Sequence, residues 1–107
     1  MPPPEFNPLE FEGFDWDVGN VTKNSKHGVE PEEAEAVFLN EPLLVLPDAK
    51  HSKSEARWQA LGRTAERRLL VVFTVRRKLI RIISARAMNK KEKAVYEKET
   101  LRSGRKS

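Results

Sequence analysis

The stretch RWQALGRTAERRLLVVFTVRRKLIRIISARA, residues 57–87, decides the fold of this 107-residue chain. Its middle run, Leu69 to Val75, is apolar at successive positions, which is typical of a strand covered on both faces. Leu79 to Ala85 follows as a second apolar strand after the turn Arg76–Lys78, and Arg57 to Arg63 precedes them as a half-exposed strand. We therefore expect three neighbouring antiparallel strands with Leu69 to Val75 at the centre.

Helices are predicted on both sides of this stretch. Asn20 suits the N-cap of a two-turn helix that holds Lys26 and His27 in its last turn and stops at Gly28. Pro31 suits the first position of a second helix, because its fixed φ fits the helix and its missing N–H would be unpaired there anyway.

The remaining elements complete a mixed architecture. Asn89 and Glu92 resemble a capping box for a last helix that runs to about Leu101. The alternation in Phe11–Trp16 and the short apolar run Leu43–Leu46 predict two further strands. The resulting order predicts an α+β fold, in which helices pack on a small, largely antiparallel sheet.

The length of the chain allows one domain. We expect it to span residues 11–101, between a flexible proline-rich N-terminal arm at 1–10 and a disordered basic tail at 102–107. The chain contains no cysteine, which excludes a disulfide framework and thiol catalysis. No apolar run is long enough for a membrane span and no secretion signal is evident, so we expect a soluble cytoplasmic protein.

Charge is divided unevenly along the chain. Residues 1–56 hold 4 Lys or Arg and 12 Asp or Glu, whereas residues 57–107 hold 16 and 4. This asymmetry predicts that the second half forms a surface for a polyanion such as nucleic acid. The alternative is that folding interleaves the two halves, so that their acids and bases pair.

Few residues suit chemistry. No nucleotide-binding, zinc-protease or serine-hydrolase motif occurs, and we expect neither a metal nor a cofactor. The acidic segment at 30–35 fits a solvated helix face better than a metal site. His27 suits either proton transfer near neutral pH or a favourable charge at a helix end, and His51 lies in a polar loop.

Arg81 and Arg86 interrupt an apolar strand. A guanidinium at such a position either binds phosphate or pairs with an acid from the first half of the chain. Positions 81 and 86 face opposite sides of a regular strand. Both therefore serve one site only if a bulge intervenes or Arg86 lies beyond the strand.

Four motifs occur in order along the chain: WDxGN at 16–20, KHGV at 26–29, HSxxExR at 51–57 and IRIISAR at 80–86. Together they resemble the BrnT family of toxins from bacterial type II toxin–antitoxin modules. The similarity covers residues 11–98. One departure is Arg67, which stands where the family commonly has a glycine.

The resemblance implies a RelE-like fold and a metal-independent endoribonuclease that cleaves RNA and so inhibits translation. It also implies a ribbon-helix-helix antitoxin as partner, commonly two copies of each in a complex able to bind operator DNA, with no membrane involved. Under this hypothesis the predicted catalytic residues are His27, Arg81 and Arg86. The predicted substrate-binding residues are Lys26, His51, Arg57 and Arg63.

Two other classes of function stay open. One is a non-catalytic interaction protein, or a co-repressor that binds nucleic acid through its partner. The other is a structural RNA-binding domain. A short neighbouring reading frame with a ribbon-helix-helix pattern would favour the toxin–antitoxin module.

Overall fold

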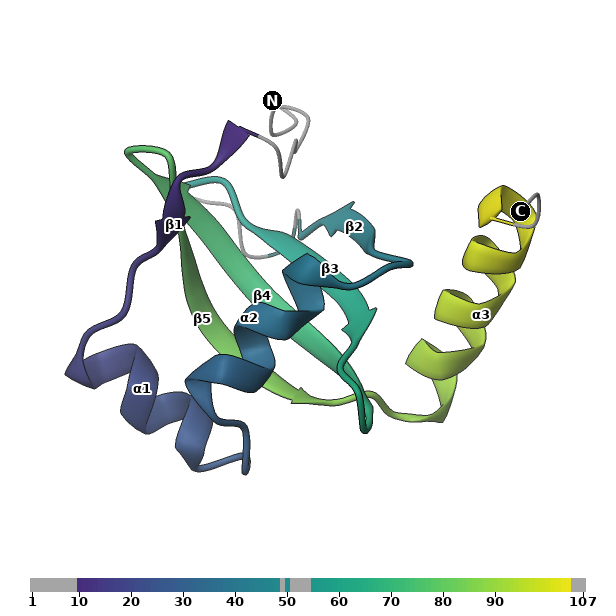
Figure 1. Ribbon diagram of the computed structural model, residues 1–107, viewed down its shortest axis with the longest axis horizontal. Helices are drawn as coiled ribbons and strands as arrows, with labels where there is room; N and C mark the ends of the chain where they lie inside the picture. The colour runs from purple at the N-terminus through teal and green to yellow at the C-terminus, as the bar shows by residue number, and fades with distance from the viewer. Residues whose placement is uncertain (1–9, 49, 51–54, 105–107) are drawn as a thin grey trace.

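The computed structural model of the chain describes residues 10–48, 50 and 55–104, with the backbone alone for 102–104. The elements in order are β1 (Gly13–Phe14), α1 (Val18–Ser25), α2 (Pro31–Leu39), β2 (Leu44–Pro47), β3 (Trp58–Arg63), β4 (Arg68–Arg76), β5 (Leu79–Ala87) and α3 (Lys90–Gly104) (Figure 1). This order confirms the α+β class. None of the helices described is long and apolar enough to cross a membrane.

The predicted ends of the chain fall largely outside the described residues. Of the N-terminal arm, 1–10, the structure describes residue 10 alone. Of the basic tail, residues 105–107 also lie outside. Residues 102–104 belong to α3, so the last helix is longer than predicted.

The five strands form one sheet in the order β1-β5-β4-β3-β2. The predicted central strand is confirmed, since β4 pairs in antiparallel fashion with both β3 and β5. β2 pairs with β3 in antiparallel fashion, and the two-residue β1 is the parallel member, beside the start of β5. β1 is shorter than the predicted strand Phe11–Trp16.

The prediction that the strand Arg57 to Arg63 is half-exposed is wrong. Most of β3 is buried, because helices pack on both of its faces. On one face α2 comes so close that a Cβ atom at Gly62 would lie 2.7 Å from Cγ1 of Val37. On the other face Leu61 packs in a cluster with Tyr96 of α3.

Alternate side chains of the sheet build two apolar clusters on opposite faces. α2 crosses one of them, the α2 face (Figure 1), with its predicted stripe of Ala34, Val37 and Phe38 buried. The ring of Phe38 meets that of Phe73 edge-on, with 5.0 Å between centroids. The strands contribute Trp58, Leu69, Val71, Phe73, Ile80, Ile82 and Ala85 to this cluster.

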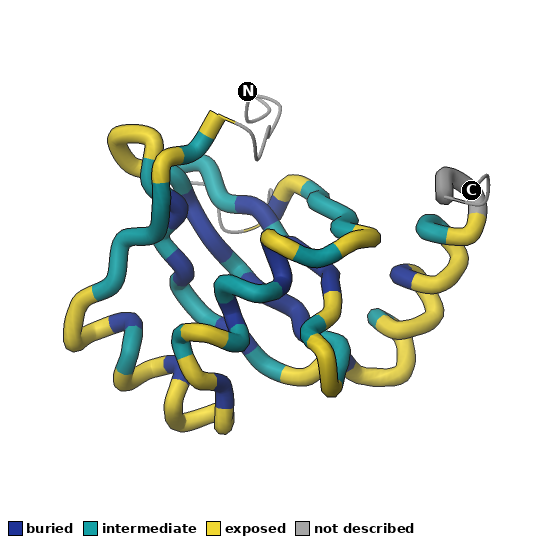
Figure 2. The backbone as a smooth tube through the Cα atoms, viewed as in Figure 1, coloured by how far each residue is buried: buried dark blue, intermediate teal, exposed yellow. Residues whose placement is uncertain are grey.

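On the opposite face, α3 covers only the end of the sheet near β2 and β3. Tyr96 packs there against Leu61 and Leu70, and its hydroxyl donates to the carbonyl oxygen of Pro42 at 2.6 Å. Most of α3 is exposed (Figure 2). None of the described helices covers the rest of this face, which we call the groove face.

The first helix begins earlier than predicted. Asp17, and not Asn20, is the N-cap of α1, and Asn20 occupies the third helical position. The two form a capping box: Asp17 Oδ1 accepts from the backbone N–H of Asn20 at 3.2 Å, and Asn20 Oδ1 accepts from the backbone N–H of Asp17 at 2.7 Å. Lys26 and His27 follow the last turn instead of lying in it. Gly28 has φ of 74°, as predicted for the residue that ends this segment.

The Asn20 amide also fixes the edge of β5 where β1 ends. The backbone N–H of Asp15 donates to the carbonyl oxygen of Ile80 at 2.9 Å, as the last bond of the β1–β5 ladder. The next outward carbonyl, that of Ile82, accepts from Asn20 Nδ2 at 3.0 Å. The same nitrogen donates to the carbonyl oxygen of Asp15 at 2.9 Å. The buried amide therefore replaces a strand residue in the ladder.

We expect Asn20→Ala to lower the free energy of unfolding by about 1–3 kcal/mol, because it leaves the buried Ile82 carbonyl oxygen without a donor. Asn20→Asp should cost more, since its carboxylate would face two carbonyl oxygens. Urea unfolding at neutral pH measures both. Thr22→Ala on the exposed side of α1 is the control, with a change within about 0.5 kcal/mol. An Asn20→Asp variant as stable as the parent would contradict this role.

Candidate nucleic-acid interface

A β-bulge brings the two predicted arginines of β5 to one face. Val72 of β4 pairs with Ser84 and Phe73 pairs with Ile82, so Ile83 is an extra residue between them. After this shift, Arg81 pairs with Thr74 and Arg86 pairs with Leu70. Positions 70, 72 and 74 of β4 share a face, and Arg81, Ser84 and Arg86 therefore share it too. A bulge between the two positions was the condition under which both arginines can serve one site, and the structure contains it.

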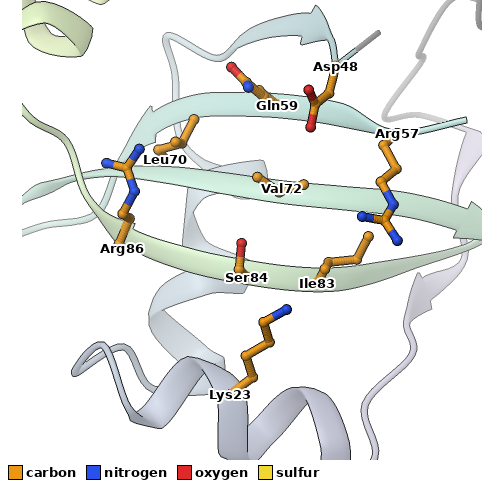
Figure 3. A pocket seen from close by; sticks show the side chains of 9 residues that line it. All are labelled: Lys23, Asp48, Arg57, Gln59, Leu70, Val72, Ile83, Ser84 and Arg86. Carbon is orange, nitrogen blue, oxygen red and sulfur yellow. The ribbon is translucent and has the colours of Figure 1, made fainter. Parts of the chain in front are cut away.

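The groove face carries a shallow groove of about 400 Å³ across β3, β4 and β5 (Figure 3). A second hollow of about 220 Å³ adjoins it, and the two share Lys23, Arg57 and Ile83. We call the two together the groove. Its polar and charged lining residues are Asn20, Lys23, Asp48, Glu55, Arg57, Gln59, Arg76, Arg81, Ser84 and Arg86.

Arg81 is held by two acids from the first half of the chain. Its guanidinium lies 3.0 Å from Asp17 Oδ2 and 3.6 Å from Asp15 Oδ1, and 17% of its side chain is exposed. The backbone N–H of Asn20 and the Arg81 guanidinium lower the pKa of Asp17. Arg81 therefore pairs with acids from the first half of the chain, which was the predicted alternative to phosphate binding. Its side chain still lines the groove.

Arg86 is held by the start of α3. It donates to both carboxylate oxygens of Glu92, at 2.8 and 2.7 Å. Hydrogen bonding to Arg86 lowers the pKa of Glu92, and the same pair raises the pKa of Arg86. Glu92 also forms the predicted capping box with Asn89, in bonds of 3.0 and 2.8 Å. The first turn of α3 is therefore tied to the groove.

Asp48 is a groove residue that sequence reasoning missed. It follows β2, is 6% exposed, and its backbone N–H donates to the carbonyl oxygen of Arg57 at 2.9 Å. In Figure 3 the Arg57 side chain extends from the start of β3 across β4 towards Ile83, while Lys23 enters from α1. From the sequence, the predicted strand ends at Leu46, and Asp48 is given no role. The sequence carries no local signal for this burial, because it depends on the pairing of β2 with β3.

Three other predicted site residues, Lys26, His27 and Arg63, are not among the residues that line the groove. Lys26 and His27 lie exposed on the turn after α1. Arg63 ends β3, where its Nε donates to the carbonyl oxygen of Glu41 at 2.9 Å. His51 lies outside the described residues. The structure thus brings Arg57, Arg81 and Arg86 together and leaves these four predictions without support from the groove.

Arg67 anchors the turn that carries His27. Its Nε and Nη2 donate to the two oxygens of Glu33, at 2.9 and 2.7 Å. Its Nη2 also donates to the carbonyl oxygen of Gly28 at 2.7 Å. Hydrogen bonding to Arg67 lowers the pKa of Glu33. The α1–α2 turn is therefore anchored to the hairpin between β3 and β4.

Comparison with known proteins gives a family match. A family model described as "Ribonuclease toxin, BrnT, of type II toxin-antitoxin system" matches residues 16–92. This range contains every lining residue of the groove. No curated protein matches the chain at a significant level. Within the described residues, no group of three or more His, Cys, Asp or Glu side chains is placed to hold a metal ion.

The Arg86–Glu92 pair predicts how stability depends on pH. The lowered pKa of Glu92 means that the contribution of the pair is complete above the ordinary value of 4.5 and is lost as the pH falls through the folded value. We expect the free energy of unfolding to fall on acidification in this range, and to fall less in Glu92→Gln. Urea unfolding at a series of acidic pH values measures this.

Glu41→Gln is the control for this prediction. Glu41 is exposed, and no ion pair of its side chain is recorded in the part of the chain that the structure describes. Its acid dependence should match that of the parent. A Glu92→Gln variant with the same acid dependence as the parent would show that the pair does not contribute.

Proposed function

Because the chain belongs to the BrnT family of ribonuclease toxins from type II toxin–antitoxin systems, we propose that it cleaves RNA in the groove and thereby inhibits translation. One observation carries this proposal. The groove gathers five cationic side chains from α1, β4, β5 and the residue before β3, namely Lys23, Arg57, Arg76, Arg81 and Arg86. A concave basic surface of this kind suits the phosphate backbone of a single strand. A RelE-like relationship stays a prediction.

The proposed reaction is transesterification within the RNA. A base removes the proton from a ribose 2′-OH, and that oxygen attacks the adjacent phosphorus. The bond to the 5′-oxygen breaks, and an acid protonates the leaving oxygen, which yields a 2′,3′-cyclic phosphate and a 5′-hydroxyl. Negative charge builds on the phosphoryl oxygens during attack. Arg81 and Arg86 are the proposed groups that stabilise it, and Arg57 and Lys23 are proposed to bind the flanking phosphate.

Ion pairing prepares the arginines for this role. Asp17 and Glu92 hold the Arg81 and Arg86 guanidinium groups in place before substrate arrives. A phosphate then exchanges with a carboxylate at an arginine that is already oriented, which limits the entropy lost on binding. This arrangement favours phosphate binding over a purely structural role, because Arg86 remains partly exposed.

Two groups are candidates for proton transfer. His27 is the residue that the family resemblance favours, together with Lys26 as a binding residue and His51 in reserve. Asp48 is the candidate that the groove itself adds, since its carboxylate lines the same hollow as Arg57 and Arg86. Substrate-binding roles for Lys26, Arg63 and His51 are part of the proposal from the resemblance alone.

The proposed chemistry needs no metal ion, because side-chain cations take up the charge of the transition state. We expect purified protein to cleave single-stranded RNA in excess EDTA and to leave cyclic or 3′-phosphate ends. Gel analysis with end-group labelling measures both. Cleavage that EDTA abolishes and magnesium restores, or products with 5′-phosphates, would contradict this mechanism.

Substitution distinguishes the two proton-transfer candidates. The variant that removes the acting group, His27→Gln or Asp48→Asn, should lose about 100- to 10,000-fold in cleavage rate at an unchanged melting temperature. The other should cleave at nearly the parental rate. Glu32→Gln, which removes an exposed carboxylate of α2, is the control with full activity. Near-parental rates in both variants would assign proton transfer to His51, or to arginine and lysine alone.

Family membership also supplies a partner, the antitoxin of a type II module. We expect a ribbon-helix-helix protein, two copies of each chain in the complex, and operator binding by that complex. Its acidic residues should cover cations within residues 57–107. Hydrogen exchange of the complex tests this, and an inhibited complex that leaves the whole basic half accessible would contradict it.

The second candidate function for the chain is that of a non-catalytic co-repressor. Absence of RNA cleavage would favour it.

A further inference from the structure

The turn between β4 and β5 is unusual in its residues. Arg76 and Leu79 are the last paired positions, so Arg77 and Lys78 form a two-residue hairpin loop. Their φ angles are 51° and 67°. Two consecutive positive values define a type I′ turn, which favours Asn and Gly because a long side chain is strained in this region. The chain therefore keeps two cationic side chains where the backbone disfavours them.

The two side chains differ from the arginines of the groove in their ion pairing. Arg76 pairs with Glu55 at 3.3 Å, as Arg81 and Arg86 pair with their own acids. Both Arg77 and Lys78 are exposed, and no ion pair of either is recorded among the described residues. Their charge is therefore available to a ligand without exchange of a partner.

The turn extends the groove. Arg76, which precedes the turn, lines the groove together with Arg57 and Arg81. From Arg86 to the turn, β5 runs for about 20 Å, at about 3.3 Å per residue. An RNA strand bound along β5 therefore has to extend past Arg76, at the end of the groove, to reach the turn.

We propose that Arg77 and Lys78 form a second phosphate-binding site, which holds the backbone of RNA that runs out of the groove. The site sets the affinity for longer substrates and takes no part in the chemistry. This inference rests on the proposed function, because it names a further contact of the same substrate. Backbone strain stored at a turn is consistent with such a site, since strain of this kind clusters where ligands bind.

Two double variants separate charge from strain. R77N/K78G removes both charges and places favoured residues in the turn, so we expect a higher melting temperature and weaker binding of long RNA. R77Q/K78Q removes the charges and keeps the strain, so we expect weaker binding without the gain in stability. K93Q/K98Q removes two exposed lysines of α3, far from the turn (Figure 1), and is the matched control.

Binding is measured with 2′-O-methyl oligoribonucleotides, which have no 2′-OH to attack, of about 4 and about 12 nucleotides. For the long RNA, both turn variants should lose about fivefold or more in affinity at low salt. Their slope of log affinity against log salt should shrink by about 1.4, or about 0.7 for each lost phosphate contact. Affinity for the short RNA, and the cleavage rate of bound substrate, should match the parent.

Unchanged affinity and salt slope for the long RNA in both variants would overturn this inference and leave the proposed function intact. An equal loss in K93Q/K98Q would also overturn it, because the effect would then be one of net charge. Parent protein that binds RNA through the turn but cleaves none would overturn the proposed function and support the turn site.

Discussion

One extra residue in β5 decides where the chemistry-bearing side chains lie. Without Ile83, Arg81 and Arg86 would face opposite sides of the sheet, one in the groove and the other under α2. Next to the bulge, where β1 no longer covers the edge of β5, the Ile82 carbonyl oxygen accepts a hydrogen bond from the Asn20 amide of α1. This hydrogen bond ties α1 to β5 directly beside the bulge that brings Arg81 and Arg86 to one face. Asn20 belongs to the WDxGN motif, and the structure gives that motif an architectural explanation.

The uneven charge of the sequence is partly resolved by folding. Acids of the first half reach arginines of the second half at several points: Asp15 and Asp17 at Arg81, Glu33 at Arg67, and Glu55 at Arg57 and Arg76. The two interpretations of the charge asymmetry, a basic surface and pairing between the two halves, therefore both hold in part. The halves interleave at the sheet, and the pairing orients cations around the groove without enclosing them. Arg77 and Lys78, in the turn beyond β4, are exposed and do not belong to these pairs.

Features set by local residues were predictable, and those set by long-range contacts were not. The central position of β4, the start of α2 at Pro31 and the capping box of α3 follow from neighbouring residues and were confirmed. The N-cap of α1 was placed wrongly because Asp17 and Asn20 carry the same local signal, and only the three-dimensional contact with Ile82 separates their roles. A bulge was named as the condition for Arg81 and Arg86 to share a face, but its position could not be predicted, because register depends on the partner strand. The burial of Asp48 depends on strands that pair across a long loop, which no local pattern reveals.

The attachment of α3 through Tyr96 has a practical consequence. Tyr96 is the one tyrosine of the chain, and burial against the sheet raises the pKa of its phenol. A helix released from the sheet would expose this phenol to water and return it to ordinary ionisation. At a pH near 10, the ordinary pKa of a tyrosine phenol, the ultraviolet absorbance of the phenolate therefore distinguishes docked from released α3 without any label. The chain carries its own optical probe of whether its last helix stays on the sheet when RNA or a partner protein binds.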